Sequence, residues 1–140
     1  MKLINVAYNI FLDDVRDPRD AFNYMHDFIY LKEYWVTVRS YDEFVKTITE
    51  RFEKESEFPR VISFDHDLAD EHYEQLLNTD KVDYNKVTEK TGYHCVQWLI
   101  NFCIDNKIEF PHYLLHTMNP VGKLNMSSLI ENYKRHEEKT

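Results

Sequence analysis

Short runs of apolar, β-branched and aromatic residues are spaced along the chain, and each run ends at polar side chains. In the first run, alternate positions from Ile4 to Leu12 are apolar, and a period of two is typical of a strand. The runs that predict strands cover residues 3–12, 35–38, 61–64 and 112–115.

Helical patterns separate these runs and follow the last one. Ser40 and Glu43 have the Ser-x-x-Glu spacing of a capping box, which predicts the start of a helix. A helix after Pro18 and a last helix capped by Asn125 are also expected. Residues 91–106 have the i, i+3, i+4 spacing of an amphipathic helix, with apolar positions at Val96, Leu99, Ile100, Cys103 and Ile104.

The alternation of strands with helices indicates the fold class. It predicts right-handed crossovers and an open parallel sheet with helices on both faces, an α/β fold. Residues 69–90 are polar and too long for an ordinary connection, so we expect an insert there. A length of 140 residues suits one domain that covers residues 1–140.

The excess of acidic over basic residues makes some classes of binding partner unfavourable. The chain has 17 Lys and Arg residues against 25 Asp and Glu residues, and this net charge of −8 disfavours binding along a long nucleic acid. A small anionic ligand is compatible with it where a metal offsets the acid. The chain has no run of 18 apolar residues, and its first residues reach Asp13 and Asp14 too early for a signal peptide. We therefore expect a cytoplasmic protein with no membrane partner.

The two cysteines, Cys95 and Cys103, lie eight residues apart in one predicted helix. They are about 12 Å apart along its axis, too far to form a disulfide there, so we expect reduced core residues.

Acidic side chains follow two of the predicted strands. In open parallel sheets, ligands bind beyond the carboxyl ends of the strands. Asp13 and Asp14 follow the first strand and Asp65 follows the third, so the three carboxylates are candidates to bind one Mg²⁺ or Mn²⁺ ion. The alternative is that these acids are ordinary turn and cap residues.

Two histidines also follow predicted strands. His66 and His116 suit paired acid and base work with Asp65, because the pKa of histidine lies near neutral pH. If the third strand continued, its alternation would point His66 away from Asp65, and a structural role for either histidine is the alternative. The spacing of cysteines and histidines does not match a structural zinc site.

Further polar residues and one glycine lie near the same predicted edge. Arg16 and Lys123 are the nearest cations, and Gly122 lies where a backbone can approach a ligand or adopt a positive φ. The candidates for substrate binding are Arg16, Arg39, Asn119, Gly122, Lys123 and Asn125.

Several motifs in order resemble one known family, the cyclic-phosphate processing receiver domains. The segments that carry the resemblance are FLDDVRDP (11–18), WVTVRSYDEF (35–44), VISFDHDL (61–68), TGYHCVQWL (91–99) and HTMNPVGKLNM (116–126). The resemblance implies a receiver-like, flavodoxin-like sheet of four to five strands and a role in handling cyclic phosphates. It also implies that Asp13 and Asp14 match the acidic metal-binding pair of receivers and Asp65 their phosphoacceptor.

The chain departs from phosphorelay receivers in two respects. A receiver has a fifth strand that ends in a lysine, but only a helix and a charged tail follow the fourth predicted strand, and Lys123 lies too close to that strand to take this role. His66, His116 and Asn119 suit phosphodiester chemistry and are not required for phosphorelay.

The sequence therefore predicts a metal-assisted phosphoesterase, a hydrolase for a cyclic nucleotide or the cyclic phosphate of an RNA end. A module that binds a cyclic nucleotide without turnover is the first alternative. A signalling receiver phosphorylated on Asp65 is the second.

Overall fold

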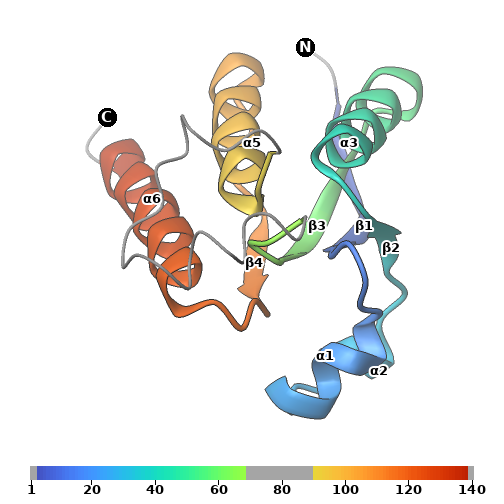
Figure 1. The fold of residues 1–140 in the computed structure, drawn as a ribbon. Coiled ribbons are helices and arrows are strands. Elements are labelled where there is room, and N and C mark those ends of the chain that lie inside the picture. Colours follow the sequence, from blue (N-terminus) through green and yellow to red (C-terminus); the bar gives the residue numbers. More distant parts are fainter. Residues whose placement is uncertain (1–2, 69–89, 139–140) are drawn as a thin grey trace.

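The computed structural model describes residues 3–68 and 90–138, and the insert expected at 69–90 lies outside them except for Lys90. Four parallel strands in the order β2-β1-β3-β4 form one sheet (Figure 1). The expected open parallel α/β sheet is thereby confirmed. The elements are β1 (Asn5–Leu12), α1 (Pro18–Met25), α2 (Ile29–Lys32), β2 (Val36–Val38), α3 (Tyr41–Glu55), β3 (Glu57–Phe64), α5 (Gly92–Asn106), β4 (His112–Leu115) and α6 (Pro120–Glu138).

The larger core lies on the face of the sheet that α3, α5 and α6 cover. These three helices lie side by side in Figure 1, and their apolar faces pack on alternate residues of the two central strands. Burial of these side chains supplies most of the hydrophobic stabilisation, roughly 1.5–3 kcal/mol for each large residue. The fully buried strand residues of this core are Ile10, Leu12, Ile62 and Phe64.

A smaller cluster lies on the opposite face, where α1 and α2 stand apart from the other helices (Figure 1). Phe11 is its centre, and the rings of Tyr30 and Trp35 pack edge-on against the Phe11 ring. The expectation of helices on both faces is confirmed, with far less cover on this face. The buried members of the cluster are Phe11, Ala21, Tyr30, Trp35 and Val61.

The helix starts follow the capping signals in part. Ser40 Oγ accepts the backbone N–H of Glu43 at 3.1 Å, which confirms the capping of α3 by Ser40. In α5 the apolar face is confirmed except at Ile104, which is 51% exposed. Both cysteines of α5 are buried and unpaired, as expected.

Two boundaries differ from the sequence prediction. β3 begins at Glu57, before Pro59, because the proline sits at a register shift opposite Tyr8, where a missing N–H can be tolerated. α6 begins at Pro120 rather than at Asn125, since proline at the first helical position lacks only an N–H that would be unpaired anyway. Asn125 is therefore not the cap, and Gly122 is helical, with no positive φ.

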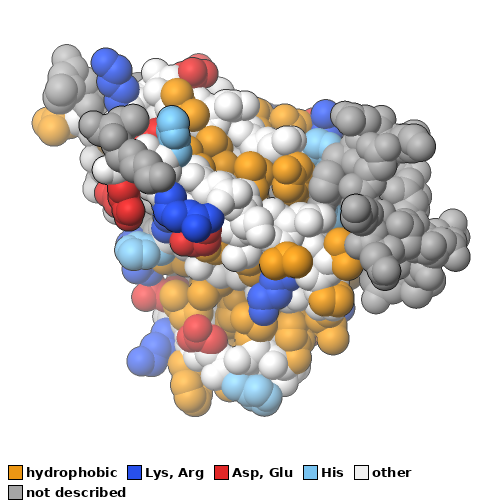
Figure 2. All heavy atoms as spheres, turned by 90° about the vertical axis from the view of Figure 1, so that its left-hand side faces the viewer, with side chains coloured by type: hydrophobic (Ala, Val, Ile, Leu, Met, Phe, Trp, Pro, Cys, Tyr) orange, Lys and Arg blue, Asp and Glu red, His pale blue; other side chains and the backbone are white. Residues whose placement is uncertain are grey.

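The surface carries charges of both signs. On the face shown in Figure 2, Lys and Arg side chains are scattered among acidic and hydrophobic ones instead of forming a basic stripe. This mixture on one face agrees with the net charge of −8, and the expectation about long nucleic acids stays a prediction. Among the described residues, no helix has both the length and the hydrophobicity to cross a membrane.

Candidate functional site

Backbone pairing continues one residue beyond three strands and brings their next side chains to one place. Asp13 N–H donates to Val38 O, Asp65 N–H to Leu12 O and His116 N–H to Phe64 O, at 3.0–3.1 Å. Side-chain ligand atoms of Asp13, Asp65 and His116 lie within 4.8 Å of one another, and all three residues are buried. The site lies at the junction of β1 and β3, where the strand order reverses and open α/β sheets bind ligands.

Asp13 is held as a carboxylate by three donors. Its Oδ1 accepts the backbone N–H groups of Val15 at 3.0 Å and Arg16 at 2.8 Å, and its Oδ2 lies 3.0 Å from His116 Nε2. Burial by itself would raise the pKa of Asp13, but these hydrogen bonds outweigh burial and hold the pKa below its usual value. Asp13 is therefore charged at neutral pH.

Asp65 is the opposite case. Burial first, and then the negative charges of Asp13 and Asp67, raise the pKa of Asp65 to about 8. The N–H of His66 donates to Asp65 Oδ1 at 2.8 Å but does not offset these effects. Two buried carboxylates that repel each other form a position where a divalent cation would relieve the repulsion.

His116 is fixed on all sides. Its ring stacks on Phe11, with centroids 4.3 Å apart and planes 12° from parallel. Nδ1 lies 2.7 Å from Ser63 Oγ, which lies 2.8 Å from the hydroxyl of Tyr30. Burial lowers the pKa of His116 more than the contact with Asp13 raises it, so the ring is neutral at neutral pH.

The contacts of Ser63, His116 and Asp13 resemble the connectivity of a catalytic triad, but the direction is wrong for nucleophilic attack. Ser63 is completely buried inside β3, and Tyr30 covers its hydroxyl. A nucleophile must reach the substrate, whereas here the hydroxyl lies at the inner end of the line and Asp13 at the edge of the sheet. Ser63 therefore orients His116 and does not attack.

The donor set fits a divalent cation. Two carboxylates and an imidazole are ligands of Mn²⁺ and Zn²⁺, while Mg²⁺ prefers oxygen ligands alone. Within residues 3–68 and 90–138, Asp13, Asp65 and His116 form the group that comes together, and Asp14 is not one of its members. Of the expected metal set of Asp13, Asp14 and Asp65, the structure thus brings Asp13 and Asp65 together and adds His116, because the backbone after β4 places His116 beside these two carboxylates. The role of Asp14 toward a metal stays a prediction.

His66 lies elsewhere. β3 ends at Phe64, and His66 lies in the bend that follows, where its side chain packs against Gly122 of α6. His66 is completely buried against Gly122, its Nδ1 lies 2.8 Å from Asp67 Oδ1, and a methyl group at Gly122 would come within 2.3 Å of its ring. The structure does not bring His66 to His116, so it gives no support to the expected pairing of the two histidines.

The turn after Asp65 is also packed against a helix start. The N–H of Gly92, the first residue of α5, donates to His66 O at 2.8 Å. A Cβ atom on Gly92 would lie 1.8 Å from the carbonyl oxygen of Asp65, so only glycine fits. The start of α5 therefore fixes the backbone that presents the Asp65 carboxylate.

Of the two arginines expected to bind substrate, one lies beside the cluster. Arg16 Nη1 lies 3.8 Å from Asp13 Oδ2, and its guanidinium contacts the sulfur of Met118 and the ring of Tyr24. Arg39 instead binds the β1–α1 loop, through the carbonyl oxygens of Asp13 and Arg16 and the carboxylate of Asp17. Arg39 thus supports the loop that supplies two donors to Asp13.

The remaining expected substrate ligands lie along the start of α6. Asn119 Oδ1 accepts the N–H of Gly122 at 3.0 Å, and Asn119 Nδ2 donates to Asp67, so this side chain caps the helix and ties it to the turn after β3. Lys123 is exposed, and Asn125 is half-buried in the second turn of the helix. The structure does not bring Asn119, Gly122, Lys123 or Asn125 into the acidic cluster.

The sequence reasoning missed Ser63 and Tyr30. Ser63 precedes Asp65 by two residues on the same strand, so alternation alone would have placed its hydroxyl on the same face as the acid. Tyr30 lies in a segment without a clear helical or strand pattern. Nothing in the local sequence indicates that its hydroxyl contacts Ser63.

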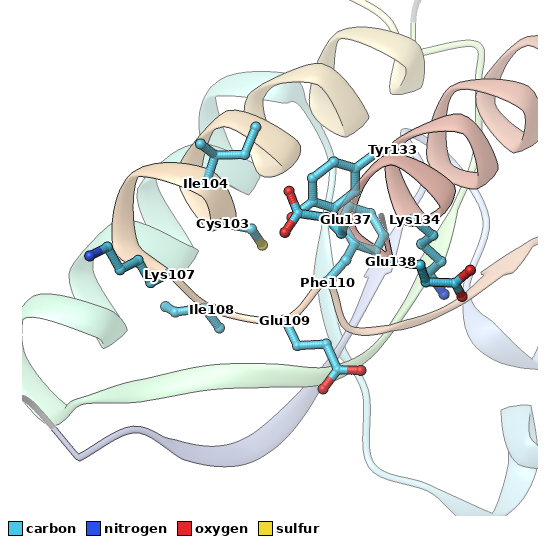
Figure 3. Close-up of a pocket in the computed structure, with 10 residues that line it drawn as sticks. All are labelled: Cys103, Ile104, Lys107, Ile108, Glu109, Phe110, Tyr133, Lys134, Glu137 and Glu138. Atoms are coloured by element: carbon cyan, nitrogen blue, oxygen red, sulfur yellow. The ribbon is translucent and has the colours of Figure 1, made fainter. Parts of the chain in front are cut away.

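A hollow of about 660 Å³ lies at the other end of the sheet, between the C-terminal ends of α5 and α6 (Figure 3). Phe110 and Tyr133 line it together with Cys103, and burial raises the pKa of that thiol to about 12. The thiol is thus protonated at neutral pH and is a poor nucleophile. The two carboxyl groups whose pKa values move in opposite directions, Asp13 and Asp65, lie instead at the carboxyl ends of the strands.

Comparison with known proteins identifies the family of the chain. Searches among curated proteins and among solved structures gave no significant match. A family model described as cyclic-phosphate processing receiver domain matches residues 8–132, which include all four strands of the sheet except the first residues of β1. The chain therefore belongs to the family of cyclic-phosphate processing receiver domains.

Proposed function

We propose that this protein is a metal-assisted phosphoesterase that opens a cyclic phosphate on a nucleotide or an RNA end. One observation carries the proposal: the buried cluster of Asp13, Asp65 and His116 at the carboxyl edge of the sheet, with ligand atoms within 4.8 Å. Membership of a family described by cyclic-phosphate processing supports the choice of substrate class.

Asp13, Asp65 and His116 would hold the cation. When bound, a divalent cation would neutralise the charge that develops on the phosphoryl oxygens and would lower the pKa of a bound water. Asp13 stays charged over a wide pH range because of its three donors, and the neutral ring of His116 offers a nitrogen without carrying a positive charge into the site. Mn²⁺ is the first choice among cations and Mg²⁺ the second.

Arg16 would orient the phosphate. Its guanidinium stands beside Asp13, and its hydrogen bond to the sulfur of Met118 at 3.4 Å is to a weak acceptor. A phosphate oxygen is a far better acceptor for an arginine, so exchange of that contact for a phosphate is favourable. Met118 is 60% exposed, which leaves this side of the guanidinium close to solvent.

In the reaction, the oxygen of water forms a bond to phosphorus and the bond from phosphorus to one ring oxygen breaks. Water loses a proton and the leaving oxygen gains one, so the product is a phosphomonoester. Asp65 is the member of the cluster that keeps some exposure, 4%, and a carboxylate that binds a cation through one oxygen can accept a proton on the other. We assign the transfer of this proton to Asp65, in place of the His66 and His116 pair.

The test is a hydrolysis assay with 2′,3′- and 3′,5′-cyclic nucleotides in the presence of Mn²⁺ or Mg²⁺. Wild type is compared with Asp65→Asn, His116→Ala and His66→Ala, and His112→Ala is the matched control, because His112 is exposed at the opposite end of the same strand as His116. We expect Asp65→Asn and His116→Ala to reduce the rate by about 10²- to 10⁴-fold and His112→Ala to leave it unchanged.

Two other outcomes would favour the alternatives. Tight binding of a cyclic nucleotide with no product after long incubation would identify a module that sequesters its ligand. Acetyl phosphate labelling of the wild type that is lost in Asp65→Asn would instead indicate a signalling receiver.

A further inference from the structure

Two buried hydroxyl groups behind His116 have no part in the proposed reaction. Tyr30 OH lies 2.8 Å from Ser63 Oγ, and Ser63 Oγ lies 2.7 Å from His116 Nδ1. Tyr30 comes from α2, Ser63 from β3 and His116 from the residue after β4, so three separate elements converge on this line. Ser63 and His116 have no exposed area, and Tyr30 is 3% exposed.

We propose that Ser63, supported by Tyr30, is a positioning residue that accepts the Nδ1 proton of His116 when Nε2 binds a divalent cation, and that it thereby strengthens cation binding. The inference rests on the proposed function, because it concerns the same cluster. It adds Ser63, which is not a ligand of the cation. Removal of the Ser63 hydroxyl should weaken cation binding although all three ligands remain.

The contact on the other side of the ring defines the state without a cation. Asp13 Oδ2 lies 3.0 Å from His116 Nε2, and a charged carboxylate can only accept a hydrogen bond. Nε2 therefore carries the proton, and Nδ1 must accept one. The hydroxyl of Ser63 donates to Nδ1, and the hydroxyl of Tyr30 donates to Ser63.

A cation on Nε2 reverses this requirement. The nitrogen that binds a metal has no proton, so a neutral ring carries its single proton on Nδ1 and must donate it. A hydroxyl group is both a donor and an acceptor, and Ser63 Oγ can accept this proton without moving. The imidazole keeps one proton in both states and stays neutral, and only the nitrogen that carries it changes.

The surroundings make the hydroxyl of Ser63 hard to replace. The stacking of His116 on Phe11 prevents the ring from turning toward another partner. Alanine at position 63 would leave Nδ1 buried without a partner, which penalises the Nδ1–H form that a bound cation requires. Threonine would keep the hydroxyl and is itself a residue that favours strands.

The first experiment measures Zn²⁺ affinity by calorimetry, since Zn²⁺ accepts carboxylate and imidazole ligands and is diamagnetic. We expect Ser63→Ala to weaken binding by about 10- to 100-fold, Ser63→Thr to restore it to within a few-fold, and Tyr30→Phe to have a smaller effect than Ser63→Ala. Thr49→Val, which removes a hydroxyl from α3 on the opposite face of the sheet, is the control and should bind as wild type does. An affinity of Ser63→Ala equal to that of wild type would overturn the proposal.

The second experiment reads the tautomer of His116 from the ¹⁵N shifts of its ring. Wild type should show Nε2–H without cation and Nδ1–H with Zn²⁺. Ser63→Ala should keep Nε2–H without cation, because Asp13 still accepts that proton, but it should need more Zn²⁺ than wild type to reach the Nδ1–H form. If the ring shifts of Ser63→Ala depend on Zn²⁺ as those of wild type do, the role of Ser63 is overturned and the cation site is left standing. Absence of Zn²⁺ binding by wild type would instead overturn the cation site, and with it the role of Ser63 toward a metal.

Discussion

On the face of the sheet under α3, α5 and α6, strand β3 carries the buried apolar side chains Ile62 and Phe64, whereas toward α1 and α2 the same strand carries Ser63 and leads to Asp65. One face of β3 is thus apolar, whereas the other combines the apolar Val61 with the polar Ser63. The packed face has three helices over it, and the polar face has two short ones (Figure 1).

The difference shows how this fold separates stability from chemistry. Buried apolar groups on the packed face stabilise the sheet without regard to the chemistry at its edge. The polar face tolerates a repelling pair of carboxylates, Asp13 and Asp65, because the sheet between them is already fixed by the core behind it. Mutations on the two faces should therefore differ in what they change.

A large loss of stability at every pH is expected on the packed face. Phe64→Ala removes a completely buried ring and should lower the free energy of unfolding by about 3–5 kcal/mol, with Ile62→Val as a milder companion at about 0.5–1.5 kcal/mol. Urea unfolding followed by circular dichroism measures both. A Phe64→Ala protein as stable as the wild type would contradict the assignment of the main core to this face.

The pH dependence of stability tests the polar face. The pKa of Asp65 is raised from its usual 3.8 to about 8, so between these values the folded protein binds more protons than the unfolded chain. Its stability without cation therefore falls as the pH rises through this window, by up to about 1.4 kcal/mol per pH unit.

Asp65→Asn isolates this contribution. The variant should be more stable than wild type at pH 8 in the presence of a chelator, with a difference that shrinks toward pH 4. His116 contributes in the opposite direction, because its lowered pKa makes stability fall as the pH drops below 6.5. Urea unfolding of both proteins across this range gives the difference, and equal stability at every pH would contradict the raised pKa of Asp65.

A smaller effect is expected where α6 meets the turn after β3. Gly122→Ala places a methyl group 2.3 Å from Cγ of His66, and overpacking of this kind typically costs about 1–3 kcal/mol. In the His66→Ala background the ring atoms are gone and only the Cβ atom of residue 66 remains, 2.8 Å from the added methyl group, so the same substitution should cost less than in wild type. Thermal unfolding of the two single variants and the double variant completes the cycle, and additive losses would contradict the contact.

The smallest effect is expected at Arg39. Arg39→Ala removes two hydrogen bonds to carbonyl oxygens of the β1–α1 loop and a partly exposed ion pair with Asp17, which together contribute about 1–2 kcal/mol. The loop would then hold the N–H groups of Val15 and Arg16 less firmly toward Asp13, and Mn²⁺ affinity should fall a few-fold. Arg60→Ala, which removes an exposed ion pair with Glu33, is the control for charge and should leave Mn²⁺ affinity unchanged.

The strands could be predicted because alternation of apolar residues is a local signal, and all four were found. Their ends were harder. The start of β3 was not predicted, because the effect of Pro59 depends on its register opposite Tyr8. The start of α6 was predicted at Asn125, whereas the helix is capped by Asn119 and begins at Pro120.

The candidate site was predicted in part for the same reason. Asp13, Asp65 and His116 each follow a strand, and the topology of a parallel sheet brings such residues together. The orientation of His66, the support of the loop by Arg39 and the contact of Tyr30 with Ser63 depend on packing between distant segments. No local pattern in the sequence carries that information.

The central claim is that Asp13, Asp65 and His116 hold a divalent cation on which the activity depends. Calorimetric titration with Mn²⁺ tests it most directly, with wild type, Asp65→Asn, His116→Ala and the control His112→Ala measured side by side. The account predicts one site per chain in wild type and in His112→Ala, and its loss in the other two variants. Mn²⁺ binding that persists unchanged in Asp65→Asn and His116→Ala would contradict it.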